Sequence, residues 1–172
     1  GETALDVSSD PYRYLRFGFL DSYPEGMSGA DQQRAVDDLA QKYHINALQF
    51  YDWMYRHEAP VPYDGNGVAP TWSSWGGEKM SRDTITGLIH AAQWRSVEAY
   101  PYSMSYAALN GYESYGVSPD WRLTYRSSGS PWSFEMLANR PDSTLWIMDP
   151  SNPAWRSHIV SQYVHQSEDI GF

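Results

Sequence analysis

Apolar runs alternate with stretches of helical period along the first hundred residues of the chain. Three short apolar runs predict strands, at residues 14–20, 45–50 and 96–102. Apolar side chains recur at helical spacing over residues 30–43 and 82–95, which predicts two helices, the second with Ser81 as its N-cap. Strands that alternate with helices in this order are typical of a parallel α/β sheet.

The loops that follow the predicted strands are much longer than those that follow the helices. The second and third strands lead into loops at 51–80 and 103–142, whereas His44 alone separates the first helix from the next strand. Loops this long are uncommon unless they are functional. Long loops at the carboxyl ends of strands are typical of barrel enzymes, whose sites lie at that edge.

The end of the chain continues the pattern less regularly. Residues 144–148 form a short apolar strand, either a strand of the main sheet or an excursion of the preceding loop, and we favour the excursion. A third helix is predicted from Pro153, with Asn152 as its cap, to about Asp169. Residues 170–172 then predict the opening of a fourth strand.

Composition narrows the range of ligands. Aromatic residues make up 16% of the chain, yet its mean hydropathy is −0.61, so many rings are expected at surfaces or in clefts. The formal net charge is −9, which argues against nucleic acid and anionic membranes as partners. No apolar run approaches the length of a membrane span. The absence of cysteine excludes disulfides and thiol chemistry.

Candidate chemistry is concentrated where the second predicted strand ends. The aromatic and ionisable side chains there are Tyr51, Asp52, Trp53, Tyr55, Arg56, His57 and Glu58. Flat rings cover the apolar face of a sugar, and charged groups exchange hydrogen bonds with its hydroxyls. The segment therefore predicts a site for a neutral, hydroxyl-rich ligand at the carboxyl edge of the sheet.

Several of these residues also have a structural interpretation. Asp52 could instead pair with Arg56 as a staple of the loop. Tyr51 and Trp53 alternate across the strand, so one could belong to the core and the other to the site. His57 could orient a carboxylate or lie exposed in the loop.

Aromatic residues of the two long loops extend the predicted binding site. Tyr102 and Tyr106 follow the third strand and are predicted to stack on a sugar. Trp72 and Trp75 lie in a stretch rich in Ser and Gly, where they are predicted to form a platform for a sugar chain, with core packing as the alternative.

No metal site and no cofactor is predicted. Residues 64–67 (DGNG) are interpreted as a turn, because the other ligands of a calcium loop are missing. Asp149 is interpreted as positioning the third helix. His158 and His165 share a face of that helix and are interpreted as structural, for want of a nearby carboxylate. The chain has no P-loop, dinucleotide-binding, GxSxG or HExxH motif.

Four segments of the chain resemble a known family. They read ALDVSSDPYRYLRFGFL, LQFYDWMYRHEAPVP, AYPYSMSYAA and LWIMDPSNPAWRSHIV, and they are similar to segments of the dextranases and cycloisomaltooligosaccharide glucanotransferases of glycoside hydrolase family 66. The resemblance implies a (β/α)8 TIM barrel that acts on α-1,6-linked glucan (dextran) or isomaltooligosaccharides with retention of configuration. Retention requires two carboxyl groups about 5 Å apart.

The resemblance also implies that part of the site lies elsewhere. In the family, the nucleophilic Asp lies in a D-G-x-H-x-D-type segment that directly follows a Gly-Phe like Gly171-Phe172, and the acid/base Glu lies further on. Residues 1–172 thus resemble the N-terminal portion of the barrel, about its first three βα units, truncated at the fourth strand. Asp52 matches an aspartate that the family needs for activity, with an implied role in holding sugar hydroxyls. Ser103 departs from the family, which has Asn there.

Two classes of function follow. The first is an endo-dextranase or a cyclodextran-forming transglycosylase, and the chain does not decide between them. The second is a non-catalytic glucan-binding or scaffold protein. The resemblance implies a secreted or cell-surface location, although the first residues contain no signal peptide. The remainder of the barrel is an expected partner, and five apolar strand residues are expected to lack cover without it, namely Ile45, Leu48, Phe50, Val97 and Ala99.

Overall fold

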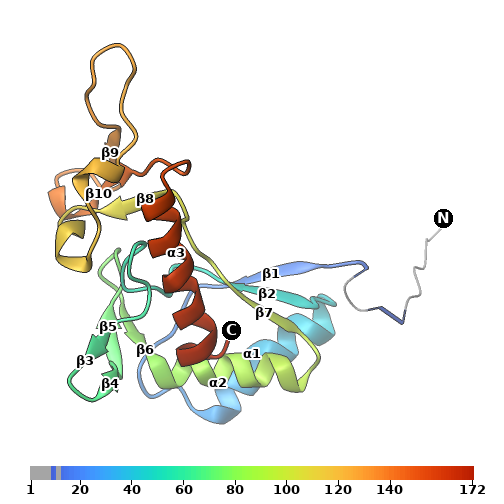
Figure 1. Ribbon diagram of the computed structural model, residues 1–172. Coiled ribbons are helices and arrows are strands. Elements are labelled where there is room, and N and C mark those ends of the chain that lie inside the picture. The colour runs from blue at the N-terminus through green and yellow to red at the C-terminus, as the bar shows by residue number, and fades with distance from the viewer. Residues whose placement is uncertain (1–8, 11–12) are drawn as a thin grey trace.

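The structure is a computed structural model that describes residues 9–10 and 13–172. The start of the first quoted segment therefore lies outside the described residues. A parallel sheet of three short strands forms the centre of the fold (Figure 1), in the order β1 (Phe17–Leu20), β2 (Ala47–Phe50) and β7 (Glu98–Pro101). All three strands lie within the predicted runs and are shorter than predicted.

Two helices pack side by side against one face of this sheet (Figure 1). They are α1 (Gly29–Lys42) and α2 (Arg82–Trp94). Ser28 caps α1 by accepting the Asp31 N–H, and Ser81 caps α2 as predicted. Each strand–helix pair is therefore a βα unit with a defined helix start, which confirms the predicted alternation.

The predicted loop 51–80 contains structure that its sequence did not indicate. Two short antiparallel hairpins lie within it, formed by β3 (Tyr63–Asp64) with β4 (Gly67–Val68) and by β5 (Thr71–Ser73) with β6 (Lys79–Ser81). The Asp64 carboxylate accepts the Asn66 N–H at 2.7 Å, so residues 64–67 form a turn, as interpreted.

The loop after β7 forms a separate antiparallel sheet, which stands above the parallel sheet in Figure 1. Its strands are β8 (Ala107–Leu109), β10 (Thr144–Ile147) and β9 (Ser133–Glu135), with β10 in the centre. Residues 144–148 are therefore an excursion, as favoured. Three short 3₁₀ helices complete this region, namely η1 (Tyr112–Tyr115), η2 (Pro119–Trp121) and η3 (Pro141–Ser143).

The third helix connects the two sheets. Helix α3 (Pro153–His165) continues into a π-helical turn, η4 (Gln166–Ile170), which packs against α2. The fourth strand predicted at 170–172 is not formed. Ile170 ends the turn, and Gly171 caps it in the left-handed conformation at φ 98°. The Phe172 ring then packs against Phe50 at 5.2 Å and Trp53 at 5.0 Å between centroids.

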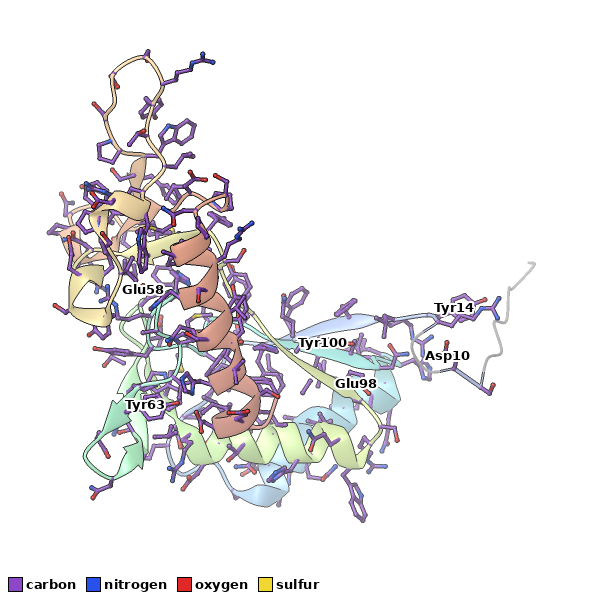
Figure 2. The ribbon with its side chains drawn as sticks, viewed as in Figure 1. Asp10, Tyr14, Glu58, Tyr63, Glu98 and Tyr100 are labelled. Atoms are coloured by element: carbon purple, nitrogen blue, oxygen red, sulfur yellow. The ribbon has the colours of Figure 1, made fainter. Side chains whose placement is uncertain are left out.

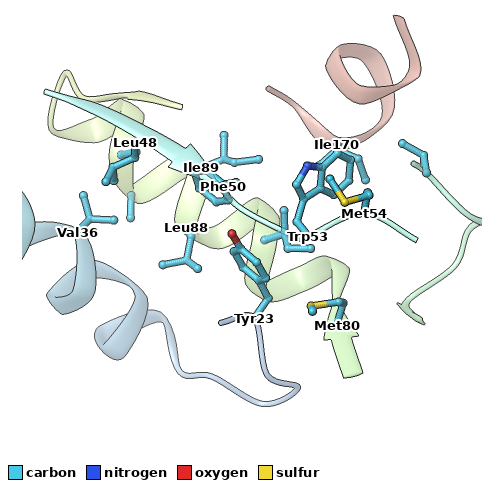
Figure 3. Packing of buried hydrophobic residues seen from close by; sticks show 14 of the residues in the cluster. Tyr23, Val36, Leu48, Phe50, Trp53, Met54, Met80, Leu88, Ile89 and Ile170 are labelled. Atoms are coloured by element: carbon cyan, nitrogen blue, oxygen red, sulfur yellow. The ribbon is translucent and has the colours of Figure 1, made fainter. Parts of the chain in front are cut away.

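The main core lies between the parallel sheet and its helices (Figure 3). Leu48 and Phe50 point into it and are fully buried, together with Val36, Ile85 and Ile89 of the helices. The expected lack of cover was therefore wrong for Leu48 and Phe50, and also for Val97, which is buried. These residues face the helices that their own βα units supply.

The opposite face of the sheet carries the uncovered apolar side chains. Phe17 is 52% exposed and Phe19 is 62% exposed, and both lie on this face with Glu98 and Tyr100 (Figure 2). In a closed barrel this face would point inward and be filled by side chains of the other strands. The sheet therefore does expose apolar side chains, as predicted, but on the face opposite to Leu48 and Phe50.

We expect residues 1–172 in isolation to self-associate or aggregate, because exposed aromatics and unpaired strand edges favour association. Light scattering after size exclusion checks this. Replacing Phe17 and Phe19 together with serine should shift the population towards monomer, whereas the same change at Trp94, which is 82% exposed on α2, should not. A monodisperse wild-type monomer with a cooperative melt would contradict this expectation.

Candidate functional site

The carboxyl ends of β2 and β7 bring together three residues that we call the carboxyl-edge cluster, namely Tyr51, Asp52 and Tyr102. The backbone N–H of Tyr51 donates to Leu20 at 2.7 Å, and that of Tyr102 donates to Phe50 at 2.8 Å, so both residues continue the parallel ladder. The two tyrosine rings lie 4.5 Å apart between centroids. The structure therefore brings together on one edge three residues that the sequence placed there.

Asp52 leaves β2 in an unusual backbone conformation. Its φ is +51°, in the left-handed region that most residues avoid but Asp and Asn tolerate. Burial raises the pKa of its carboxyl. The indole of Trp75 opposes this rise, and the charges of Glu78 and Asp21 add to it. The Trp75 N–H faces this carboxylate without completing a hydrogen bond of good geometry. Asp52 is thus half-buried beside other acids.

Tyr102 is held in its neutral form. Burial raises its pKa to about 12, and Tyr51, Asp52 and Tyr106 add to the shift. Its hydroxyl therefore keeps its proton at neutral pH and is able to donate a hydrogen bond. Phe19 meets the Tyr51 ring edge-on at 6.5 Å, which extends the aromatic surface toward β1.

Trp53 and Trp72 both pack in the core. Complete burial leaves Trp53 no surface for its predicted contact with a sugar, whereas the contact of Trp72 stays a prediction. Trp53 is 0% exposed and Trp72 is 6% exposed. The Trp53 indole donates to the Tyr102 carbonyl at 3.2 Å, and the Trp72 indole donates to the Trp53 carbonyl at 2.9 Å. Each buried ring thus has a backbone acceptor for its N–H, which removes the usual cost of burying it. Together they fix the backbone beneath the carboxyl-edge cluster.

Arg56 pairs with Glu58 and not with Asp52, so the alternative in which Asp52 staples the loop is wrong. The Arg56 guanidinium donates to Glu58 and to the carbonyls of Leu109 and Asn110, at 2.9 and 2.8 Å. Glu58 is 0% exposed, and its other oxygen accepts the Leu109 N–H at 3.0 Å. This pair joins the β2 loop to β8. These polar contacts serve the fold, and the sugar contact of Arg56 stays a prediction.

His57 is buried, so the alternative of an exposed loop position is wrong. Burial and the neighbouring Arg56 charge lower its pKa to about 4, which makes the imidazole neutral at neutral pH. Neither ring nitrogen has a hydrogen-bond partner among the described residues, so His57 orients no carboxylate of this part of the chain. Its ring lies 6.0 Å from that of Trp75, and it therefore supports Trp75 by packing.

Trp75 and Tyr106 also remain available to a ligand. Trp75 is half-buried beside Asp52, and Tyr106 is 47% exposed near Tyr102. Their contact with a sugar stays a prediction.

Sequence reasoning missed several neighbours of the cluster. Asp21 directly follows β1 on the same edge, and the rule that led to Asp52 would also have found it. Glu78 reaches Asp52 from the β5–β6 hairpin, whose existence was not predicted. Ser103 exchanges hydrogen bonds with the buried Gln166 at 2.9 and 3.0 Å, which joins the end of β7 to η4. No local signal connects residues so distant in the chain.

The three polar residues that the sequence interpretation called structural, Asp149, His158 and His165, have hydrogen-bond partners within the chain. Asp149 accepts hydrogen bonds from Ser151 at 2.8 and 2.7 Å just before α3. His158 bonds the Glu58 carbonyl at 2.9 Å, whereas His165 lies 2.9 Å from Asp169, a carboxylate that the sequence interpretation overlooked. Across residues 9–10 and 13–172, no three His, Cys, Asp or Glu side chains are grouped as a metal site. None of the described helices has the length and apolar character needed to cross a bilayer.

The chain is an α/β protein with parallel βα units, and tyrosines and a carboxylate lie at the carboxyl edge, where proteins of this class place their ligand sites. The family model for glycosyl hydrolase family 66 matches residues 1–172. The chain belongs to this family, as the quoted segments predicted.

Individual relatives agree with this assignment. A cycloisomaltooligosaccharide glucanotransferase of Niallia circulans is 35% identical over all 172 residues, and a dextranase of Streptococcus salivarius is 20% identical over 187 aligned positions. The crystal structure of a Paenibacillus sp. cycloisomaltooligosaccharide glucanotransferase complexed with cycloisomaltoheptaose superposes with a TM-score of 0.90 at 34% identity, over 97% of this chain. The chain spans 18% and 21% of the two sequence relatives and 24% of the crystallised chain.

Proposed function

We propose that the complete protein is a retaining glycosidase or glucanotransferase that acts on α-1,6-linked glucan. In this proposal the described βα units are part of a (β/α)8 barrel, and their carboxyl edge forms one wall of the substrate cleft. The carboxyl-edge cluster on adjacent parallel strands, in a chain of family 66, is the observation that carries the proposal. The relatives named dextranase and cycloisomaltooligosaccharide glucanotransferase support the choice of glucan.

Each member of the cluster has a chemical role in this proposal. The tilted rings of Tyr51 and Tyr102 offer an apolar surface to one face of a glucose unit. The Tyr102 hydroxyl donates a hydrogen bond, because its proton is retained. The Asp52 carboxylate accepts hydrogen bonds from sugar hydroxyls, and these strengthen as the ring distorts towards the transition state.

The covalent chemistry requires a second set of residues. A retaining enzyme uses one carboxylate as nucleophile and a second carboxyl group as acid/base, roughly 5–5.5 Å apart. In this proposal both lie on strands that are not among residues 1–172. Water then releases a linear product from the glycosyl-enzyme, or a glucan hydroxyl releases a transfer or cyclic product.

We expect no measurable turnover of dextran by purified residues 1–172, kept dilute to limit association, because positioning groups cannot replace a covalent route. The complete protein should release isomaltooligosaccharides or cyclic products from dextran, with retained anomeric configuration by NMR, and should leave starch, an α-1,4 glucan, intact. Product release by the isolated chain would contradict the proposal that the nucleophile and the acid/base lie outside residues 1–172. A complete protein that binds dextran without cleaving it would establish the non-catalytic alternative.

A further inference from the structure

A groove of about 660 Å³ lies between α3 and the loop that follows β2. We call it the tyrosine groove, because Tyr55, Tyr63 and Tyr115 line it. Gln162 and His165 of α3 form the facing wall. Its volume falls within the range of roughly 300–1,000 Å³ that ligand pockets occupy. None of its lining residues belongs to the carboxyl-edge cluster.

One wall of the groove is a rigid pair of tyrosines. The hydroxyls of Tyr55 and Tyr115 lie 2.8 Å apart, and their rings meet edge-on at 5.9 Å between centroids. The Arg56 guanidinium lies 4.5 Å from the Tyr115 ring centroid, over its face. Since Arg56 is itself tied to Glu58 and to β8, this wall is preorganised, which lowers the entropic cost of binding.

The other wall holds an exposed tyrosine in place. Tyr63 is 50% exposed, its ring meets the His165 ring edge-on at 5.6 Å, and its hydroxyl donates to Asp169. His165 lies 2.9 Å from the same carboxylate. The β3–β4 hairpin is thereby anchored to the end of α3, as Figure 2 shows for Tyr63 beside that helix. The ring is kept at the groove although half its surface is open to water.

The chemistry of the lining selects a neutral ligand with many hydroxyls. None of the groove's described lining residues is a lysine, arginine, aspartate or glutamate. The charged groups next to the lining are already paired, Arg56 with Glu58 and Asp169 with Tyr63 and His165. The tyrosine rings offer flat apolar surface, and the tyrosine hydroxyls and the Gln162 amide offer both donors and acceptors. Rings that alternate with uncharged hydrogen-bonding groups suit a sugar chain.

The groove lies away from the side of α3 on which a barrel would continue. Its walls come from the loop between β2 and α2, from Tyr115 of η1 and from α3, while η4 at the end of α3 packs against α2. Successive βα units of a barrel add in one direction, so a fourth unit would lie beyond α3 on its other side.

We propose that the tyrosine groove binds a second stretch of neutral glucan, so that a long chain is held at two places at once. This inference rests on the proposed function for the identity of the glucan. A chain held at two places binds with an effective concentration that strengthens the weaker contact. A short oligosaccharide reaches only one of the two places and gains nothing from the groove.

The test compares long and short substrates in the complete protein. Replacing Tyr63 with alanine should raise KM for high-molecular-mass dextran several-fold, on the order of 3–10-fold for the loss of one stacking ring. Values of kcat, and both constants for isomaltotriose, should stay unchanged. Gln162→Ala should act in the same direction. Tyr63→Phe keeps the ring but loses the hydroxyl contact with Asp169, so its KM should lie between those of wild type and Tyr63→Ala.

Two controls decide the outcome. Tyr43→Ala removes a tyrosine that is 68% exposed at the end of α1, and it should leave both substrates unaffected. A second readout needs no turnover: in native gels containing dextran, Tyr63→Ala placed in the Asp52→Asn background should be retarded less than Asp52→Asn alone. Equal KM and equal retardation for Tyr63→Ala and its parent would overturn the inference. A wild type that cleaves no dextran would instead overturn the proposed function, and the gel would still test the groove.

Discussion

Replacing Asp52 with asparagine in the complete protein is expected to lower kcat/KM on dextran by a factor on the order of 10² or more, with the fold retained. The substitution keeps the size of the side chain but removes its charge. The lost interaction is a charge-assisted hydrogen bond that tightens in the transition state, and a factor of 10² corresponds to about 2.7 kcal/mol. Steady-state kinetics on dextran measure the effect.

The backbone conformation at Asp52 allows this substitution without adding strain. Asp52 has φ +51°, and asparagine tolerates the left-handed region as well as aspartate does. The melting temperature should therefore not change. Asp64→Asn in the β3–β4 turn is the matched control, because Asp64 is an exposed aspartate whose oxygen bonds a backbone N–H that asparagine also bonds. Near wild-type kinetics for Asp52→Asn would leave Asp52 without a role in the reaction, and a collapsed melting temperature would make it structural.

Replacing Glu58 with alanine is expected to destabilise the fold by about 3–5 kcal/mol, because it leaves the largely buried Arg56 without its anion. It also removes the acceptor of the Leu109 N–H in the antiparallel sheet. Both losses act on the junction between the β2 loop and β8. Urea unfolding of the complete protein, followed by tryptophan fluorescence, measures the change.

Two comparisons separate the charge from the packing at this junction. The double replacement Arg56→Met with Glu58→Leu should cost less than the sum of the two single changes, because neither charge is then left unpaired. Asp38→Ala, which breaks the exposed i,i+4 pair with Lys42, should change the unfolding curve little. A Glu58→Ala variant as stable as wild type would show that the pair is not needed at the junction.

The βα units could be predicted because each has a strong local signal. Helices α1 and α2 combine a helical apolar period with a serine cap, and the strands are short apolar runs. The hairpins of the 51–80 loop could not be predicted, since strands of two or three residues show no period. Gly171 illustrates a different ambiguity. A glycine beside apolar residues suits the start of a strand as well as the left-handed cap that it forms here.

Of the candidate site, the sequence predicted the position of those residues that directly follow a strand. Asp52 and Tyr102 were found because the carboxyl ends of parallel strands share an edge. The burial of Trp53 and Trp72 was not, because a tryptophan is buried at little cost once a distant carbonyl accepts its N–H, and no local pattern shows that carbonyl. The sequence also did not show that Phe17 and Phe19 of β1 are exposed. Both alternating faces of that strand carry apolar residues, so alternation does not show which one meets the helices.

The left-handed backbone at Asp52 also restricts how this position changes over evolutionary time. A residue with φ +51° is accommodated well by aspartate, asparagine or glycine, and poorly by glutamate or any bulky or β-branched side chain. Of the three well-tolerated residues, only aspartate carries a charge. A substitution of Asp52 therefore gives either a folded variant without the carboxylate, when the new residue is asparagine or glycine, or a chain with a strained backbone. If Asp52 has the proposed role, a single substitution to asparagine or glycine would remove that role and leave the chain folded.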